Sequence, residues 1–189
     1  MTDINYINPN YVGNKIMGGY RFNNKEGFIA PGHNSVLKDN GNFYIVHHIR
    51  KEYNPNCFYM HVRKILWSKD GWPMISPERY AGEVEEKIEI DLVIGLWEFL
   101  ILHRDINRLI NSNSYSIGDN GDISGHYRGK FYIEGENEIK IELLVHGKYE
   151  TYKGKIIPAW DWEENHKTLV ITAINDKGIA LWGKKSRVQ

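Results

Sequence analysis

The sequence predicts an all-β protein, in which one antiparallel sheet is followed by a small antiparallel barrel. Apolar residues recur mostly with a period of two, which is the spacing of side chains on one face of a strand. Gly, Asn, Asp and Pro separate the alternating segments, as they do between strands. Aromatic residues make up 13% of the chain, a share that suits either bulky sheet cores or surfaces that stack on sugars.

Six segments show this alternation most clearly, and in chain order they are residues 43–50, 58–67, 92–102, 131–133, 138–146 and 168–174. Residues 119–122 (DNGD) and 175–178 (NDKG) predict hairpin turns, because Asn and Gly accept the positive φ that such turns need. A short helix is expected only over residues 105–111. The other connections are expected to be short.

A change in composition near residue 83 predicts a domain boundary, where a segment with several prolines gives way to a charged stretch. Residues 1–83 contain about four predicted strands with aromatic residues interspersed among them, which is the content of one β-propeller blade. Residues 84–189 offer seven or eight strands, enough for a small closed barrel. A blade normally buries both faces against neighbouring blades, so the first part is expected to pack on the barrel or to need a partner.

Charge and cysteine content exclude several functions. Lys and Arg number 24 and Asp and Glu number 24, so the chain has no excess of positive charge for nucleic acid or an anionic membrane. Cys57 is the single cysteine, which rules out an intrachain disulfide and a cysteine-based zinc site. No stretch reaches the length of a membrane span, and residues 1–11 are polar rather than a signal peptide.

An ordered set of motifs spans nearly the whole chain. In the first part it comprises residues 30–37 (APGHNSVL), 44–50 (YIVHHIR), 61–67 (HVRKILW), 71–73 (GWP) and 76–83 (SPERYAGE). In the second part it comprises residues 95–97 (GLW), 152–154 (YKG), 158–163 (PAWDWE) and 180–185 (ALWGKK). This succession resembles the last propeller blade and the C-terminal β-barrel domain of endo-1,5-α-L-arabinanases of glycoside hydrolase family 43.

The resemblance implies a role in degrading the α-1,5-linked arabinan of plant pectin. Glycoside hydrolysis needs two carboxyl groups that flank the scissile bond. In the family these groups lie on earlier blades, so no catalytic residue is assigned to this chain. We therefore expect it to be inactive alone and to form the closing blade and accessory barrel of such an enzyme, with an upstream catalytic propeller fragment as a candidate partner and an extracellular location.

His33 is the one functional residue of the family that maps onto this chain. The resemblance implies that it belongs to a calcium site at the propeller axis of the intact enzyme. Calcium prefers oxygen ligands, and one imidazole is a poor site by itself. We therefore expect His33 to be exposed and to bind no metal in this chain alone.

Three other histidines invite a metal-site interpretation that strand geometry disfavours. Alternation places His47 on one face of its strand and His48 with Arg50 on the other, so His47 and His48 cannot chelate one ion. His61 is able to pair with either across the sheet. Cross-strand polar packing is favoured, with Arg50 near the sugar-facing rim as a candidate substrate-binding residue.

Asp161, Glu163 and Glu164 form the densest acidic group, interleaved with two tryptophans. Neighbouring carboxylates on a loop are expected to be solvated and ionised, which favours turn and barrel packing over catalysis. Trp160 and Trp162 are candidates for sugar contact.

Residues 95–97 are also similar to the Gly-x-Trp motif of lipocalin barrels, in which the Trp plugs one end. This similarity keeps open an alternative function, a barrel that binds carbohydrate or another small ligand without catalysis.

Overall fold

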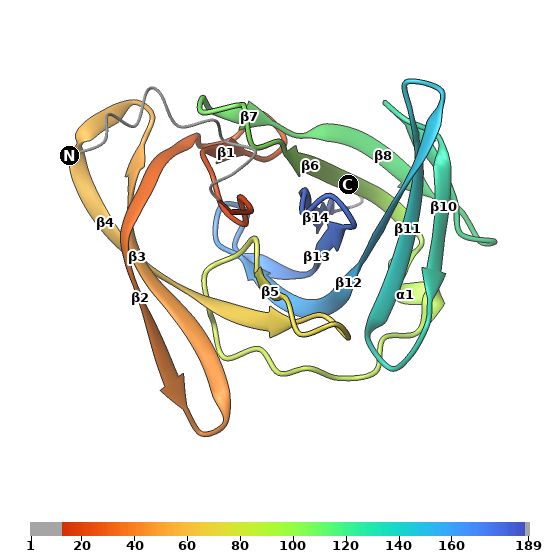
Figure 1. Cartoon of the computed structure of the whole chain (residues 1–189), viewed down its shortest axis with the longest axis horizontal. Coiled ribbons are helices and arrows are strands. Elements are labelled where there is room, and N and C mark those ends of the chain that lie inside the picture. Colours follow the sequence, from red (N-terminus) through yellow and green to blue (C-terminus); the bar gives the residue numbers. More distant parts are fainter. Residues whose placement is uncertain (1–12, 188–189) are drawn as a thin grey trace.

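The computed structural model describes residues 13–187, and nearly all of its regular structure is β-strand, which confirms the predicted class (Figure 1). Five of the six predicted strands are present at the expected positions, and both predicted hairpin turns connect strands. The sixth, over residues 92–102, begins only at Gly95, because residues before it form the helix α1 (Ile90–Val93). No helix of the described residues is long and apolar enough to cross a membrane.

The first sheet has the strand order β5-β4-β3-β2-β1-β7. Its strands are β1 (Tyr20–Arg21), β2 (Phe28–Asp39), β3 (Asn42–Lys51), β4 (Asn54–Trp67), β5 (Pro73–Ile75) and β7 (Ile110–Asn111). Neighbouring strands run antiparallel except at one edge, where β7 from the second part of the chain pairs with β1 in parallel. The expectation of a purely antiparallel sheet is therefore wrong at this edge.

The second sheet closes into an eight-stranded antiparallel barrel, in the order β10-β11-β12-β13-β14-β6-β8-β9. Its strands are β6 (Gly95–Leu102), β8 (Asn113–Ile117), β9 (Asp122–Gly125), β10 (Gly129–Ile133), β11 (Glu138–Val145), β12 (Lys148–Asp161), β13 (His166–Asn175) and β14 (Ala180–Lys185). Closure pairs every strand on both sides for part of its length, which removes exposed sheet edges.

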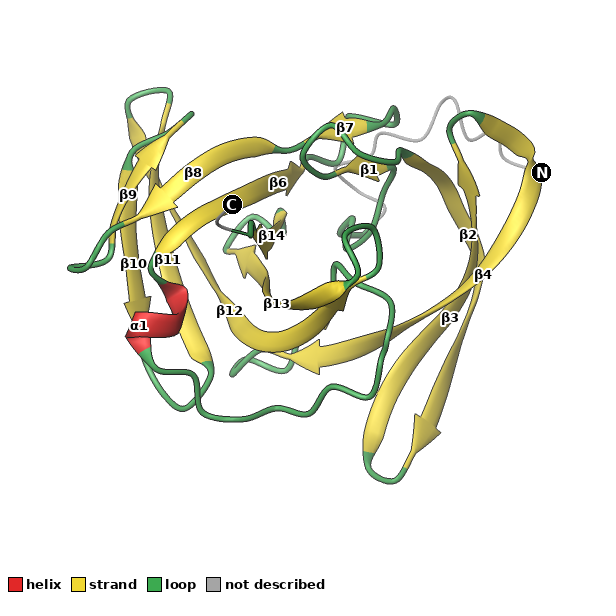
Figure 2. Cartoon of the chain, turned by 180° about the vertical axis from the view of Figure 1, so that it is seen from behind, coloured by secondary structure: helices red, strands yellow, loops and turns green. Residues whose placement is uncertain are grey.

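The barrel interior is filled with apolar side chains, all from residues 88–181. Trp97 of the Gly-x-Trp motif is fully buried, and its indole N–H donates to the carbonyl of Val93 at 2.7 Å. Helix α1, which ends at Val93, lies at one end of the barrel strands (Figure 2). The Trp therefore ties this helix to the barrel interior.

A second core joins the two sheets, and we call it the interface core. The first part of the chain and the outside of the barrel both contribute buried side chains to it: Tyr20, Phe22, Phe28, Ile45, Ile49, Ile65 and Ile75 from the former, and Leu100, Leu102, Ala180 and Trp182 from the latter. One face of the first sheet is thus covered by the barrel. The boundary expected at residue 83 stays a prediction.

The helix expected over residues 105–111 is absent, which corrects that prediction. Residues 104–109 form turns and irregular backbone instead. The Ile110 N–H, which a helix would direct at the Ile106 carbonyl, donates instead to the Gly19 carbonyl at 3.1 Å, and the Lys15 ammonium donates to the carbonyls of His103 and Ile106.

Candidate functional site

His33 reaches the outer face of the first sheet, the face turned away from the barrel, through an irregularity in β2. The register between β2 and β3 shifts on both sides of Gly32, and His33 has a φ of 45°. Such bulges re-aim a side chain. The His33 ring is exposed, as expected, and its Nδ1 lies 3.0 Å from Nδ1 of His48.

Arg50 lies on the same face, two residues from His48. Its guanidinium carbon is 4.3 Å from the centre of the Phe58 ring, and Nη1 donates to the Pro55 carbonyl at 3.2 Å. The His48 ring packs edge-on against Phe58, with 5.1 Å between ring centres. We call His33, His48, Arg50 and Phe58 the outer-face cluster. The structure brings together His33 and Arg50, the two candidate residues of the first part.

The outer-face cluster does not by itself suit calcium. Its donors are imidazole and guanidinium nitrogens, whereas calcium takes six to eight oxygen ligands. Among residues 13–187, the hydrogen bonds and ion pairs of His33, His48 and Arg50 involve no carboxylate. Any calcium site that uses His33 would need oxygen ligands from outside this cluster.

His47 and His61 lie on the opposite face of the sheet, as the alternation predicts. They are cross-strand partners in β3 and β4 and both are buried. The fully buried Arg63 donates to Nε2 of His47 at 3.2 Å, and its Nη2 lies 3.5 Å from Nδ1 of His61. Burial lowers the pKa of His47 to about 4 and, with the Arg63 charge, that of His61 to about 2. Both rings therefore stay neutral and serve as packing partners of Arg63.

Three carboxylates meet at the junction between the first sheet and the barrel, and we call them, with their central lysine, the Lys184 cluster. The Lys184 ammonium lies 2.9 Å from Glu78, 3.2 Å from Asp161 and 2.9 Å from Glu163. The carboxylate oxygens approach one another closely enough to hold a metal ion. In this structure the ammonium group takes the position that a cation would need.

Asp161 and Glu163 differ in their electrostatics. Burial would raise the pKa of Asp161, but Lys184 and the backbone N–H groups of Glu163 and Glu164 together lower it. Burial raises the pKa of Glu163 despite its contact with Lys184. The expectation that this acidic group is solvated is therefore wrong for Asp161, which is buried, because Lys184 lies beneath it. The expected packing role fits the geometry better than catalysis.

The two candidate tryptophans lie at the end of β12, away from the outer-face cluster. Trp160 is half-buried. Trp162 is exposed, but its indole N–H donates to the Arg79 carbonyl at 3.1 Å and the Arg79 guanidinium lies 4.7 Å from its ring centre. Arg79 thus covers part of the surface that a sugar would use, and sugar contact at Trp160 and Trp162 stays a prediction.

Several residues of these clusters were not singled out from the sequence. Phe58 could have been found from the sequence, because it lies two residues from Met60 on the exposed face of a predicted strand. Glu78 and Lys184 carry none, since 106 residues separate them and only the packing of two sheets brings them together.

Comparison with known proteins agrees with this architecture. Residues 77–183 match the family 43 C-terminal lipocalin-like domain. The extracellular endo-α-(1→5)-L-arabinanase 2 of Bacillus subtilis is 30% identical over 180 residues, which are 92% of this chain and 38% of that protein. The extracellular arabinanase of Thermotoga petrophila is 26% identical over 160 residues, which are 83% of this chain and 34% of the relative.

Solved structures show the same fold. The family 43 YxiA protein of Bacillus licheniformis superposes with a TM-score of 0.87 at 34% identity, over 93% of this chain and 40% of that one. The T. petrophila arabinanase superposes with a TM-score of 0.89 at 24% identity, over 95% and 41% respectively. The chain thus spans well under half the length of these proteins. It belongs to glycoside hydrolase family 43 and corresponds to the C-terminal portion of these relatives, which includes the lipocalin-like domain.

Proposed function

We propose that this chain supplies the closing blade and accessory barrel of an extracellular arabinan-degrading hydrolase, and that hydrolysis requires upstream propeller blades. The observation that carries the proposal is the exposed part of the outer face of the first sheet, around Phe58 and Met60. Phe58 of the outer-face cluster is 58% exposed, and Met60, the cross-strand partner of His48, is 75% exposed. A propeller blade buries such a face against its neighbour, whereas the other face here is already covered by the barrel.

The acidic groups of the chain support a non-catalytic role for it alone. Hydrolysis with inversion needs an acid and a base about 6.5–9.5 Å apart, with room for a water molecule. The Lys184 cluster instead surrounds an ammonium group with its carboxylates. By family resemblance the acid and base come from earlier blades, and calcium in the intact enzyme would draw on His33 together with ligands from those blades.

The test is co-expression of the chain with the coding sequence upstream of it, or with the propeller portion of the B. subtilis arabinanase. We expect no release of reducing sugar from debranched arabinan by the chain alone, and release by the assembled pair. Met60→Glu should weaken assembly, because it places a charge in the apolar contact. Tyr149→Glu is the matched control, since Tyr149 is 70% exposed on the barrel.

Turnover by the purified chain alone would contradict the proposal, provided that Asp161→Asn or Glu163→Gln abolishes it. That result would move catalysis to the Lys184 cluster. Equal assembly of the Met60→Glu and Tyr149→Glu variants would instead show that the outer face is not the contact.

A further inference from the structure

A cavity of about 220 Å³ lies between the first sheet and the barrel, and neither Trp160 nor Trp162 lines it. The turn that connects β4 to β5 forms one wall and includes Ser68, Asp70 and Trp72. Strands β12 and β13 and the turn after β13 form the other. Ligand sites for drug-sized molecules measure about 300–1,000 Å³, so this cavity fits a smaller group, about one sugar unit.

Trp72 offers an unused aromatic surface at the rim of the cavity. Its side chain is 53% exposed. Two other tryptophans are exposed in the described residues, but Trp67 packs edge-on against Phe43 and Trp162 lies beneath Arg79. Trp72 has neither a ring nor a cation against it in residues 13–187. The turn holds it in place, because the Ser68 backbone N–H donates to the Trp72 carbonyl at 3.0 Å and the Ser68 hydroxyl accepts from the Trp72 N–H at 3.0 Å.

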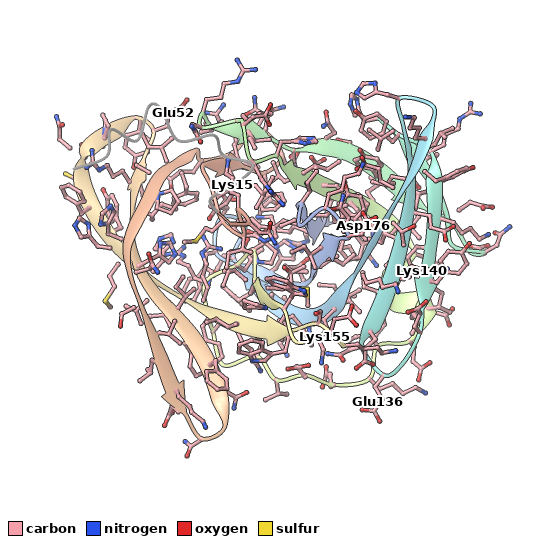
Figure 3. The ribbon with its side chains drawn as sticks, viewed as in Figure 1. Lys15, Glu52, Glu136, Lys140, Lys155 and Asp176 are labelled. Carbon is pink, nitrogen blue, oxygen red and sulfur yellow. The ribbon has the colours of Figure 1, made fainter. Side chains whose placement is uncertain are left out.

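Charged groups of both signs line the cavity. Asp70 and Asp176 supply carboxylates, and Lys153 supplies an ammonium group. Asp176 lies in the turn between β13 and β14 and is labelled in Figure 3. Among residues 13–187, none of these three takes part in an ion pair. A neutral polyhydroxyl ligand suits such a lining, since each hydroxyl both donates and accepts.

Asn175 adds an unsatisfied donor in the cavity wall. Its side chain is only 7% exposed, and Oδ1 accepts from the backbone N–H groups of Lys177 at 3.1 Å and Ile179 at 2.8 Å. These two bonds fix the orientation of the amide, so Nδ2 is the remaining donor. Nδ2 is buried and has no partner among the described residues. Such groups are rare in folded proteins. Because Nδ2 is closed to solvent, a ligand hydroxyl would reach it only if this wall moved.

We propose that this cavity binds one unit of a neutral oligosaccharide, with the Trp72 indole against the apolar face of the sugar ring. The C–H groups of a sugar face are weakly positive and suit the negative face of an indole. Asp70, Asp176 and Lys153 then hydrogen-bond the hydroxyl groups around the ring. The site is separate from the outer-face cluster and from the Lys184 cluster, and it would hold polysaccharide at the junction of the sheet and the barrel.

The chemical class of the ligand follows from the cavity, whereas its identity as an arabinose unit rests on the proposed function.

The experiment uses the full ¹⁵N-labelled chain and follows the tryptophan indole signals during titration with arabinotriose, xylotriose and cellotriose. Trp72→Phe identifies the Trp72 signal. We expect arabinotriose to shift it. Trp72→Ala should weaken binding about tenfold, as loss of a central Trp contact costs 1.4 kcal/mol or more.

Two further variants make the test specific. Trp67→Ala removes an indole that is 42% exposed and lies outside the cavity, and this variant should bind as the unaltered chain does. Asp176→Asn keeps the shape of the turn and should weaken binding. A shift of the Trp72 signal with xylotriose or cellotriose alone would support the site and count against arabinan as its ligand. No shift with any of the three sugars, or binding unchanged by Trp72→Ala, would overturn the proposal, whatever the outcome of the assembly experiment.

Discussion

Lys184 shows how one residue holds the sheet and the barrel together. It is almost fully buried, and although burial would lower its pKa, the three surrounding carboxylates raise it, so the ammonium stays charged. Glu78 comes from the segment after β5, while Asp161 ends β12 and Glu163 follows it. Removal of one partner from a buried ionic cluster leaves uncompensated charge, which is far more costly than loss of an exposed pair.

We therefore expect Lys184→Met to lower the free energy of unfolding by about 3–5 kcal/mol, because three carboxylates then lack their cation. Urea denaturation followed by tryptophan fluorescence measures the change. Lys87→Met is the control, since Lys87 pairs with Glu89 at the surface, and it should unfold at the same urea concentration as the unaltered chain. A Lys184→Met protein as stable as this control would show that the carboxylates are neutral in the folded state.

The buried histidines make the stability of the folded protein depend on pH in the acid range. Their folded-state pKa values, about 4 for His47 and about 2 for His61, lie below the value of about 6.5 expected in the unfolded chain. Above about pH 6.5 both states are neutral at these rings and full stability is present. As the pH falls through about 6.5 toward 4, the unfolded chain binds protons that the folded one does not, so stability is lost.

We expect His61→Gln to flatten this loss of stability, even if the variant is less stable at neutral pH. Urea unfolding across the same pH range gives the slope directly. His126→Gln removes an exposed imidazole and should keep the original slope. Identical slopes for the two variants would mean that carboxyl groups rather than the buried rings set the acid response.

Strand β12 is the hardest of the strands to predict from the sequence. Its 14 residues include Gly154 and Pro158, both of which weaken a strand prediction. Pro158 is tolerated because β11 pairs with β12 only up to Lys155, which leaves one side of the strand free at the proline. Strand β2 was concealed in a similar way, since residues 33–39 are exposed on both faces and show no alternation. Long regular strands were predictable, and bent or bulged ones were not.

The same limit applies to the candidate site. Alternation along β3 correctly separates His47 from His48 and Arg50, because it depends only on neighbouring residues. The meeting of His33 with His48 depends on a register shift in β2, and the Lys184 cluster depends on packing between sheets. Neither leaves a periodic signal in the sequence.

Gly154 allows β12 to approach β13 closely. A Cβ at this position would lie inside contact distance of backbone atoms of Thr172 and Ala173, which cannot move without breaking the ladder. We expect Gly154→Ala to cost about 1–3 kcal/mol of stability through overpacking. Gly118→Ala is a matched control, as its Cβ would meet only the Asp122 carbonyl oxygen at 3.8 Å. Thermal unfolding compares the two, and an unaltered Gly154→Ala melting temperature would show that the strands can separate there.

At the scale of the whole molecule, the two cores predict that the two parts of the chain differ in their ability to fold alone. The barrel interior uses only residues 88–181, whereas the interface core needs both parts of the chain. We expect residues 84–189 to fold when expressed alone and residues 1–83 to remain largely unfolded. Amide hydrogen exchange of the two pieces measures this directly. Strong protection in residues 1–83, with none in residues 84–189, would reverse the assignment.

Neighbouring side chains of β14 serve different cores, since Leu181 enters the barrel and Trp182 enters the interface core. A barrel exchanged between relatives would therefore carry its share of the interface core on its outer surface. Recombination at residue 83 would separate Trp182 from Tyr20, whose ring packs 5.4 Å from it. A crossover before Tyr20 keeps both. We therefore expect the blade and the barrel to be inherited together as one unit, even where sequence comparison marks a border between them.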